Sequence, residues 1–540
     1  MKTQGTQPLF VLLCATAVTF CSSQVIEKEV VVIGGGIAGL AAARQIVNRG
    51  RGRFSVHVYE ARRERYGGRV WTNRLKNPRA RGLEVDLGGN TLNVVNQFTN
   101  PLLNLTRDLE LETATISNAQ FIVPWLNKKY TDDELMQAMI QASSIISDAV
   151  NTTRHQGKDR SIRDAIDSQL KEKGVGKEDV RSLLLRSLPS YVISEYSALH
   201  YQADSLDFGY EQVLLDGMGE LMDRLVSGSE DEKPMKIRLR TAVRQVKVDR
   251  SQGKVTLRLK DGSQVTVDEV IVAVPAPVIA KGDLLFEPSL PKEYQWAVSQ
   301  IGMSDGNKVV VEFDVPFWPN DHGVFIAAAQ HEVDRGFLQT WLNIHKVLGK
   351  PVLVGLLFGD AARRFESLSD EEVQDSVLQK LQAVFGNDAV SSKNIVKILR
   401  SAWTSDQWSG GASSYPKVGN VPKLWDTFAE PLCPNVYFAG EHTVFRGHGT
   451  LHGAYASGIR AADLLLSGYC EEKAKEEERK RKEEARRKAE LKKKKKEQGL
   501  DTEDDEEDKE EVKEREQQTG EEKTVEEIDE SVKEEVKDEL

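Results

Sequence analysis

The pattern of apolar and polar residues is most informative near the start of the chain. Residues 30–33 form a short apolar run, VVVI, as expected for a strand buried on both faces of a parallel sheet. The small and apolar residues 41–47 then predict a helix, and residues 54–59 predict a second strand that ends at Glu60. A strand, a helix and a second strand in this order predict a βαβ unit.

Three glycines lie where the first strand turns into the helix. Gly34, Gly36 and Gly39 have GxGxxG spacing, which permits a tight turn, a close backbone approach to a pyrophosphate and close packing of helix on strand. The N-terminus of the helix offers unpaired N–H groups to phosphates. Glu60, about 20 residues beyond the glycines, can bind a ribose diol. A glycine-rich turn without a ligand is the alternative, but the register of all these parts indicates a dinucleotide site.

The rest of the body alternates between helical and strand-like segments. A long helical region is predicted from about Thr131 to Val226, and residues 237–275 return to strands with a turn at Asp261-Gly262. Residues 284–400 mix strands with helices. A last apolar strand at 436–439 leads through a glycine-rich loop into a helix at 453–466.

This order predicts an α/β protein in which a Rossmann-like nucleotide-binding domain is discontinuous and carries an inserted α+β substrate-binding domain. The nucleotide-binding segments are assigned to residues 24–90, 236–285 and 401–470. The substrate domain is assigned to residues 91–235, which are mostly helical, and 286–400. Residues 471–540 form a charged tail.

Both ends of the chain carry addressing signals. Residues 1–23 resemble a secretory signal peptide, with Lys2 before the apolar stretch Leu9–Phe20 and small residues before a cleavage site at Gln24. An uncleaved signal anchor is the alternative, although the apolar run is short for a membrane span, and no later segment is long and apolar enough. The C-terminal residues 537–540 read KDEL, the signal that a retrieval receptor binds. Together they predict a protein of the endoplasmic reticulum lumen that binds the KDEL receptor.

Three further features depend on that address. The N-x-T sequons at Asn104 and Asn151 are candidate glycosylation sites in the lumen. Cys433 and Cys470 could pair there, or could be a buried thiol and a free one. No CxxC pair or metal-ligand cluster occurs, so no metal site is predicted.

The charge of the chain is concentrated in the tail. Residues 471–540 hold 20 basic and 30 acidic side chains, a net of −10 of the chain's −11. The body is therefore close to neutral, and its charge indicates no nucleic-acid partner. Residues 471–500 have many i,i+4 charge pairs and no apolar stripe, which favours a single solvated helix. Residues 501–540 have the composition of a disordered segment.

Several motifs in the body resemble the flavin-containing amine oxidase family, over roughly residues 29–466. They are GGGIAGLAAA, GGRVWTN, DLGGN, TAVRQV, VIVAVP, NKVVVEFDVPFW, SAWTSDQWSGG and YFAGEHT followed by TLHGAYASG. The likeness is greater to the polyamine oxidase and lysine-specific demethylase branch than to the monoamine oxidases. The resemblance implies bound FAD, an amine substrate and O2.

The resemblance also implies roles for single residues. The pyrophosphate would be held by Gly34, Gly36 and Gly39, and the adenosine ribose by Glu60. The adenine would contact Val243, and the isoalloxazine would pack on Trp403. The residues expected beside the flavin, the phosphates or the ribityl chain are Arg69, Glu441, Thr450 and Leu451, and two further cofactor-binding candidates are Arg62 and Gly68. Ala412 stands where monoamine oxidases carry the cysteine that links the flavin, so the FAD is expected to be non-covalent.

Lys308 is the candidate catalytic residue, because the resemblance places it where a lysine holds a water against flavin N5. It lies in an otherwise apolar strand, and an unpaired buried ammonium is costly, so it requires a partner. The alternatives are an edge-strand lysine that reaches solvent and, for Trp403, ordinary core packing.

The reaction implied by the resemblance is hydride transfer from the carbon beside an amine nitrogen to the flavin, followed by reoxidation by O2 to hydrogen peroxide. The substrate pocket departs from the family pattern. Ser413 stands where an aromatic residue is usual, with Tyr415 two residues on, and Asn93 replaces a usual acid or histidine. Glu195 could pair with a distal ammonium or be a surface helix residue. A polyamine-like or peptidyl amine is the expected substrate; the alternatives are an L-amino-acid oxidase and a flavin-binding protein without oxidase turnover.

Overall fold

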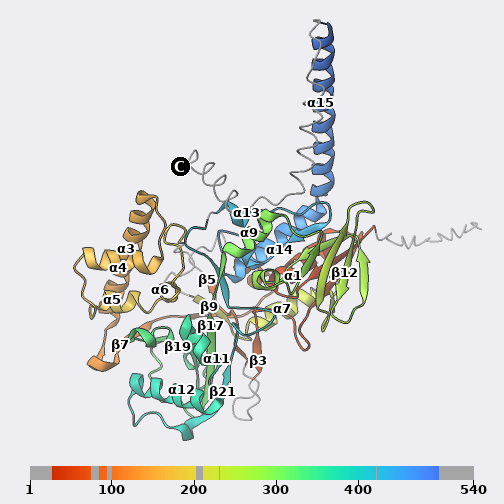
Figure 1. Cartoon of the computed structure of the whole chain (residues 1–540). Coiled ribbons are helices and arrows are strands. Elements are labelled where there is room, and N and C mark those ends of the chain that lie inside the picture. The colour runs from red at the N-terminus through yellow and green to blue at the C-terminus, as the bar shows by residue number, and fades with distance from the viewer. Residues whose placement is uncertain are drawn as a thin grey trace, which may run out of the picture. The chain divides into compact units, whose positions relative to one another are not determined.

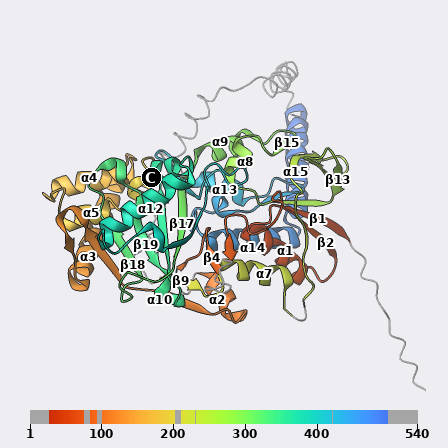
Figure 2. The same cartoon turned by 90° about the horizontal axis from the view of Figure 1, so that it is seen from below.

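The structure is a computed structural model, and it describes residues 27–74, 84–93, 100–201, 211–229, 232–420 and 422–497. The signal peptide and the KDEL sequence predicted above lie outside these residues. The chain divides into a compact unit that ends at Cys470 and a second unit, Glu471–Leu540. Figures 1 and 2 show the arrangement of elements within the first unit in two views.

A sheet of five parallel strands, in the order β10-β2-β1-β14-β23, organises the compact unit. The bounds are β1 Lys28–Ile33, β2 Phe54–Tyr59, β10 Lys236–Arg238, β14 Glu269–Val272 and β23 Val436–Phe438. Because strands from three distant parts of the chain pair in one sheet, the prediction of a discontinuous Rossmann-like domain is confirmed.

Both faces of this sheet are covered, as its apolar strands require. Val30 and Val32 pack in one core with α1 (Ile37–Arg49), α7 (Met218–Ser227) and α14 (Leu451–Leu466). Val31 and Ile33 pack in another core on the opposite face. That core contains a four-stranded sheet, β13-β12-β11-β15, and three short helices. Their bounds are β11 Val243–Asp249, β12 Lys254–Leu259, β13 Gln264–Val267, β15 Leu285–Glu287, α8 Ala276–Ala280, α9 Lys292–Gln300 and α13 Lys423–Ala429.

A second large sheet has seven strands, in the order β21-β17-β20-β19-β18-β7-β8. The bounds are β7 Ala119–Val123, β8 Lys128–Lys129, β17 Gly306–Phe313, β18 Val324–Ala327, β19 Phe337–Asn343, β20 Val352–Phe358 and β21 Ile395–Arg400. Its neighbours are α10 Ile344–Leu348, α11 Asp360–Glu366 and α12 Asp370–Phe385. Phe313, Trp341 and Leu353 of this sheet share a buried core with Phe365 of α11 and Leu381 of α12, which leaves the other face of the sheet for the site described below.

Helices α3 Asp132–Gln156, α4 Ile162–Glu172, α5 Val180–Leu185 and α6 Pro189–Val192 follow β8. Figures 1 and 2 both show α3, α4 and α5 grouped at one end of the folded body. The region predicted as helical from about Thr131 to Val226 does contain these four helices and α7, but it also contains a strand that was not predicted, β9 (Glu211–Leu214), before α7. Thr131 is the N-cap of α3 and forms a complete capping box with Glu134, which fixes the start of this helix.

Three small sheets and one further α-helix complete the described α-helices and strands of the compact unit, which also contains short 3-10 helices. They are β3 Thr72–Arg74 with β4 Glu84–Asp86, β5 Leu92–Asn93 and β6 Thr113–Ile116 on either side of β9, β16 Ile301–Ser304 with β22 Ser413–Pro416, and α2 Pro101–Asp108. Cys433 and Cys470 form a disulfide, so the first of the two alternatives for these cysteines is the one found.

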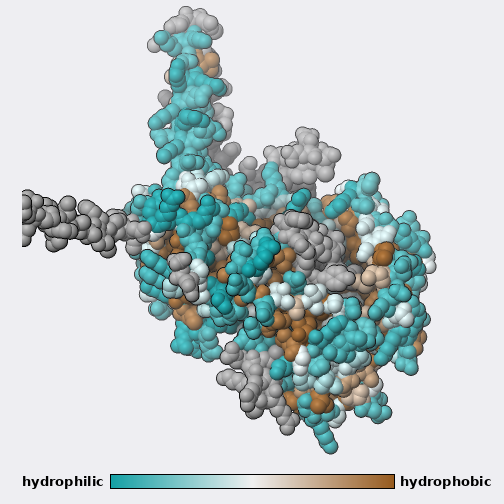
Figure 3. All heavy atoms as spheres, turned by 180° about the vertical axis from the view of Figure 1, so that it is seen from behind, coloured by the Kyte–Doolittle hydropathy of each residue, from teal (hydrophilic) through white to brown (hydrophobic). Residues whose placement is uncertain are grey.

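The tail begins as a helix, α15, Tyr469–Glu497. Its surface is hydrophilic along nearly its whole length (Figure 3), and pairs such as Glu483–Arg487 and Glu484–Lys488 join successive turns at 3.2 Å. This agrees with a solvated single helix. Among the described residues, no helix has the length and apolar content needed to cross a membrane.

Candidate active site

A cavity of about 520 Å3 receives residues from both large sheets. The predicted residues that line it are Gly34, Gly36, Glu60, Arg62, Gly68, Arg69, Val243, Lys308, Trp403, Ser413, Glu441, Thr450 and Leu451. Segments far apart in the sequence therefore meet at one site. Gly39, Glu195 and Tyr415 are not among its lining residues. Asn93 lies in β5, and its side chain is outside the described part of the chain.

The glycine turn after β1 has a geometry that requires glycine. Gly34 has φ +108°, and a Cβ there would lie 2.7 Å from the Ala273 carbonyl oxygen. A Cβ on Gly39 would lie 2.0 Å from the Gly34 carbonyl oxygen, so this residue lets α1 pack on the strand. A Cβ on Gly36 would meet no atom nearer than 4.0 Å, because the backbone there borders the cavity. Gly36 is the N-cap of α1 and provides no side-chain cap, which leaves the first N–H groups of the helix available to an anion.

Glu60 is buried at the end of β2, where its carboxylate is held by backbone donors. Oε2 accepts from Gly35 N and Oε1 accepts from Arg62 N, both at 2.8 Å. Each carboxylate oxygen can accept a second hydrogen bond, so Glu60 can still bind a ribose hydroxyl. The predicted diol-binding residue is thus oriented by the glycine turn itself.

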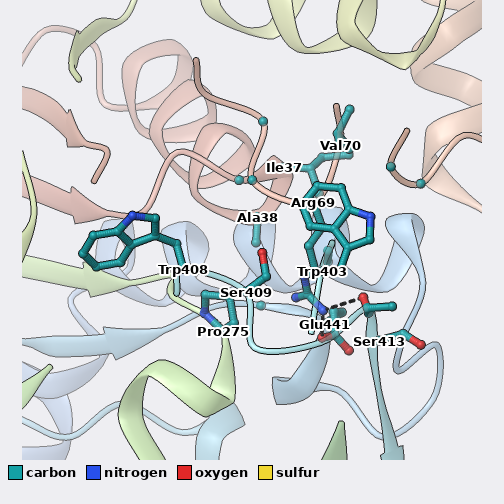
Figure 4. Close-up of a pocket in the computed structure, with 18 of the residues that line it drawn as sticks. Ile37, Ala38, Arg69, Val70, Pro275, Trp403, Trp408, Ser409, Ser413 and Glu441 are labelled. Atoms are coloured by element: carbon teal, nitrogen blue, oxygen red, sulfur yellow. Dashed lines mark hydrogen bonds and ion pairs between the residues drawn. The ribbon is translucent and has the colours of Figure 1, made fainter. Parts of the chain in front are cut away.

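Arg62 joins this end of the cavity to the loop 401–411. Its two terminal nitrogens donate to the two oxygens of Asp406 at 2.7 and 2.8 Å, and one also donates to Ser409 Oγ at 2.9 Å. Ser409 and Trp408 line the cavity, and Figure 4 shows Trp408 and Trp403 well separated with Ala38 between them. Asp406 and Ser409 were missed from the sequence, because their partner Arg62 lies more than 340 residues away. Trp408 was missed as well.

Glu441, which is buried, and Arg69, which is partly buried, form an ion pair in the same cavity (Figure 4). Arg69 Nη1 donates to Glu441 Oε1 at 2.7 Å and to the Ala412 carbonyl at 3.0 Å. Glu441 Oε2 accepts from Gly449 N at 2.8 Å and from the Ser414 hydroxyl. Burial alone would raise the pKa of Glu441, but Arg69, His442 and the Ser414 hydroxyl outweigh it and lower the pKa to about 2. Glu441 is therefore an anion that fixes the loop leading to Thr450.

His442 also lines the cavity and was not predicted. Burial lowers its pKa to about 4, so the imidazole is neutral at pH 7. Its Nδ1 is buried without a hydrogen-bond partner among the described residues. A buried ring nitrogen without a hydrogen-bond partner costs free energy. The GEHT motif, which contains His442, was the sequence signal that could have indicated this residue.

Lys308 reaches the cavity from β17, where it faces Leu356 of β20. Its Nζ donates to the Gly88 carbonyl at 2.5 Å and to Asn90 Oδ1 at 2.6 Å. The edge-strand alternative does not hold, because β17 has β20 on one side and β21 on the other. The partners come from the DLGGN stretch.

Trp403 is held at the cavity by hydrogen bonds. Its Nε1 donates to the Leu87 carbonyl at 3.1 Å and its backbone N donates to Asn307 Oδ1 at 2.9 Å. The ring meets Trp71 edge to face at 6.1 Å. The tryptophan is thus oriented at the cavity and does not fill the interior of a core.

The predicted substrate residues separate into two groups. Ser413 lines the cavity, and its Oγ lies 2.8 Å from Ser304 Oγ. Tyr415 points to a buried aromatic cluster, with its ring 5.6 Å from Tyr196, so it does not replace an aromatic residue at the site of Ser413. Glu195 is exposed in a turn and not on a helix, and its Oε2 lies 3.5 Å from the Tyr415 hydroxyl. Its predicted pairing with a substrate ammonium has no support from this placement.

The fit of a flavin dinucleotide can be judged from these residues. An uncapped helix N-terminus, a backbone without side chains at Gly36 and Gly68, and a buried carboxylate at Glu60 meet the requirements of a pyrophosphate and a ribose. No cysteine lines the described cavity, and Ala412 lies in its wall. The residues fit a non-covalent FAD.

Comparison with known proteins identifies the family. A profile of the flavin-containing amine oxidoreductases matches residues 37–466, most of the chain. The chain belongs to this family. It is an FAD-dependent amine oxidase, as predicted from the motifs.

The amine oxidase is similar to proteins of both expected branches. It is 29% identical to lysine-specific histone demethylase 1 homolog 2 of Arabidopsis thaliana over 82% of the chain and 58% of that protein. It is 29% identical to polyamine oxidase 4 of rice, Oryza sativa subsp. japonica, over 84% of the chain and 91% of that protein. The chain thus spans little more than half of the demethylase homologue. A putrescine oxidase structure with bound putrescine shares the fold, with a TM-score of 0.65 at 21% identity over 82% of this chain and 99% of that one.

Proposed function

We propose that this amine oxidase acts in the lumen of the endoplasmic reticulum on a secondary or primary amine with a polyamine-like or peptidyl chain. The observation that carries the proposal is that Lys308 lies in the wall of the cavity that holds the glycine turn and the Arg69–Glu441 pair. The names of the relatives support an amine of this kind, since polyamine oxidases are among them.

The bound FAD would accept a hydride from the carbon beside the amine nitrogen and pass the electrons to O2, giving hydrogen peroxide and an imine that hydrolyses to an aldehyde and a smaller amine or ammonia. The amine must react uncharged. The Lys308 ammonium and the apolar residues around it disfavour a second cation there, which lowers the pKa of a bound amine. Gly88 and Asn90 orient the Lys308 Nζ, which we infer positions a water at the reacting end.

An L-amino-acid oxidase would need an arginine to clamp the substrate carboxylate. Arg62 and Arg69 are the arginines in the described wall of the cavity, and both are paired with carboxylates of this chain, Asp406 and Glu441. A free carboxylate would have to compete with these pairs. The geometry therefore favours an amine without a carboxylate beside it.

The proposed compartment rests on several features of the chain. The signal-like N-terminus and the C-terminal KDEL motivate it. The Cys433–Cys470 disulfide supports it, since disulfides persist in oxidising compartments. Asn104 and Asn151, the proposed glycosylation sites, are exposed on α2 and α3. A glycosidase-sensitive mass shift and secretion on deletion of residues 537–540 are the expected results; a chain that is neither glycosylated nor released would contradict the address.

The activity is tested with the mature full-length protein. It should be purified with bound FAD and incubated with amines, polyamines and L-amino acids while hydrogen peroxide is measured. Turnover of amines supports the proposal. Turnover of L-amino acids alone favours an L-amino-acid oxidase. A yellow protein that produces no hydrogen peroxide with any of the compounds would be a flavin-binding protein without oxidase turnover.

A further inference from the structure

Arg65 is a partly buried arginine in contact with the wall of the flavin cavity. It does not line the cavity itself, but Gly68 does, and the Gly68 carbonyl accepts from Arg65 Nη1 at 2.8 Å. The same nitrogen donates to the carbonyls of Tyr66 at 3.3 Å and Val70 at 3.0 Å. The guanidinium is therefore fixed in the glycine turn that follows β2.

The guanidinium of Arg65 also lies over two indole rings. Its carbon is 5.2 Å from the ring centre of Trp71 and 5.9 Å from that of Trp403, and the two rings meet edge to face at 6.1 Å. A cation is attracted to the face of an aromatic ring within about 6 Å. Arg65 thus holds a positive charge next to Trp403, which lines the cavity.

Trp403 lies at the end of the cavity that holds Lys308. The indole Nε1 donates to the Leu87 carbonyl at 3.1 Å, and Lys308 Nζ donates to the next carbonyl, that of Gly88, at 2.5 Å. The charge of Arg65 is therefore held near the part of the cavity to which the candidate catalytic lysine belongs.

The hydrogen bonds that Arg65 makes with described residues go to carbonyls, and none goes to a carboxylate. Its charged neighbours are Glu60, Arg62 and Asp406. Burial, with a smaller contribution from Arg62, lowers the pKa of Arg65 to about 10, although the two carboxylates act against it. The guanidinium is therefore charged at pH 7.

Glu60, Arg62, Arg65 and Asp406 form a four-charge group whose net charge is zero. Arg62 binds both oxygens of Asp406, so this pair is balanced within itself. The hydrogen bonds that Glu60 accepts from described residues come from two backbone N–H groups, so the charge that balances it is that of Arg65. Removal of Arg65 would leave one negative charge beside the cavity.

We propose that Arg65 raises the reduction potential of the bound FAD, because it holds the balancing positive charge of the four-charge group beside Trp403. Two-electron reduction adds negative charge to a flavin, which a nearby positive charge favours and a nearby negative charge opposes. The inference depends on the bound FAD and not on which amine is oxidised, so it holds or fails separately from the proposed substrate.

The test measures the reduction potential of the full-length holoenzyme, by slow anaerobic reduction beside a dye of known potential and without substrate. In Arg65→Gln we expect the ratio of reduced to oxidised flavin at a given potential to fall at least about tenfold, a decrease of about 30 mV for a two-electron couple. Arg65→Lys keeps the charge and loses the planar contact with the two rings, and it should stay within about threefold of the parent. An unchanged potential in Arg65→Gln, or equal decreases in both variants, would overturn the proposal.

Arg44 is the matched control for Arg65. Its guanidinium also donates to three carbonyls, those of Leu225, Val226 and Lys233, each at 2.8 Å, and it does not line the cavity. Arg44→Gln should leave the potential unchanged. A decrease as large as that of Arg65→Gln would show a general effect of losing a buried arginine and would overturn the proposal.

Asp406→Asn changes the balance of the four-charge group in the opposite direction. It leaves Arg62 without its carboxylate, so the group gains a net positive charge. We expect the ratio of reduced to oxidised flavin at a given potential to rise at least about threefold. A fall or no change would contradict the role of this group, and the measurement decides even if Arg65→Gln does not fold or retain FAD.

Discussion

Arg69 Nη1 lies 2.7 Å from Glu441 Oε1, and this contact joins residues 372 positions apart in the sequence. One partner follows the first βαβ unit and the other follows the last strand of the same sheet. Glu441 also accepts hydrogen bonds from Gly449 N and from the Ser414 hydroxyl. The pair therefore fixes three loops around the cavity at once.

Removal of the Glu441 charge should destabilise both the fold and the cofactor site. In Glu441→Gln the Arg69 guanidinium keeps its burial and loses its counter-charge, so we expect a loss of about 3–5 kcal/mol in the free energy of unfolding. Urea denaturation of the holoenzyme measures it, and the release of flavin fluorescence reports the cofactor site. An unchanged midpoint would mean that solvent already screens the pair.

The pKa of Glu441 also predicts acid sensitivity. It falls from an ordinary 4.5 to about 2 in the folded chain, so the stabilisation is complete above pH 4.5 and is lost as the pH falls from 4.5 towards 2. The corresponding free energy is about 3 kcal/mol. Unfolding curves between pH 5 and pH 3, at about unit steps, should show a shallower loss of stability in Glu441→Gln than in the parent.

His442 predicts a second acid-sensitive step at higher pH. Burial lowers the pKa of His442 from 6.5 to about 4 in the folded chain. Between these two pH values the unfolded chain binds the proton more readily than the folded chain, so the free energy of unfolding decreases progressively as the pH falls from 6.5 towards 4. His442→Gln should remove this step and leave the one from Glu441. The melting temperature at pH 7 and pH 5 is the measurement, with the exposed His155 replaced by Gln as a control. A parent whose melting temperature does not change over this range would contradict the assignment.

The Arg62–Asp406 pair should control how firmly FAD is held. It connects the Glu60 turn to the loop that carries Trp403 and Trp408. Asp406→Asn should release FAD at least about fivefold faster, since a bidentate charged contact worth about 1 kcal/mol or more is weakened. Flavin fluorescence after dilution measures the rate.

Asp179→Asn provides the matched control for that variant. Asp179 makes the same two-point contact with Arg181, at 2.8 and 2.7 Å, and does not line the cavity. Equal release rates in the two variants would rule out a specific role of Arg62 and Asp406.

The parts of the site that follow from local sequence were predictable. The turn geometry of Gly34 and the orientation of Glu60 arise within one βαβ unit, so the spacing of glycines and acid is sufficient to place them. The parallel sheet was likewise predictable, because its strands are apolar runs that can be recognised locally in the sequence.

Contacts between distant segments could not be read from spacing. Asp406 contacts Arg62, which lies 344 residues away in the sequence, and no local pattern indicates that contact. The pairing of Cys433 with Cys470 stayed open because residue spacing does not show which segments meet. Tyr415 was expected as a possible aromatic wall, yet it packs against Tyr196 in the core of α3–α6, a fact that depends on how the two domains meet. The family motifs supplied part of this long-range information, because a resemblance to a family implies the fold of that family.

Lys308 should affect turnover and not cofactor binding. Lys308→Met keeps the length of the side chain and removes the ammonium held by Gly88 and Asn90. We expect FAD to remain bound and the rate of flavin reduction or reoxidation to fall at least about a hundredfold, as for loss of a positioned proton-handling group. Stopped-flow absorbance separates the two half-reactions.

Lys346→Met is the matched control for Lys308. The Lys346 ammonium also donates to backbone carbonyls, at 2.5 Å to Asp321 and 3.4 Å to Ser117, but it does not line the cavity. The control should retain normal rates. Unchanged rates in Lys308→Met would remove this lysine from the mechanism, and equal losses in both variants would indicate a general effect on folding.

The Cys433–Cys470 disulfide should stabilise the folded body. It closes a loop between residues 37 positions apart, which contains β23, the GEHT segment and α14. Replacement of both cysteines by serine should lower the free energy of unfolding by about 3–4 kcal/mol, through the greater freedom of the unfolded chain. Thermal unfolding of the double variant and of the parent, each with and without reductant, is the measurement. Reductant should lower the melting temperature of the parent alone, because the variant has no bond to lose; a similar decrease in both would show that the effect does not come from this bond.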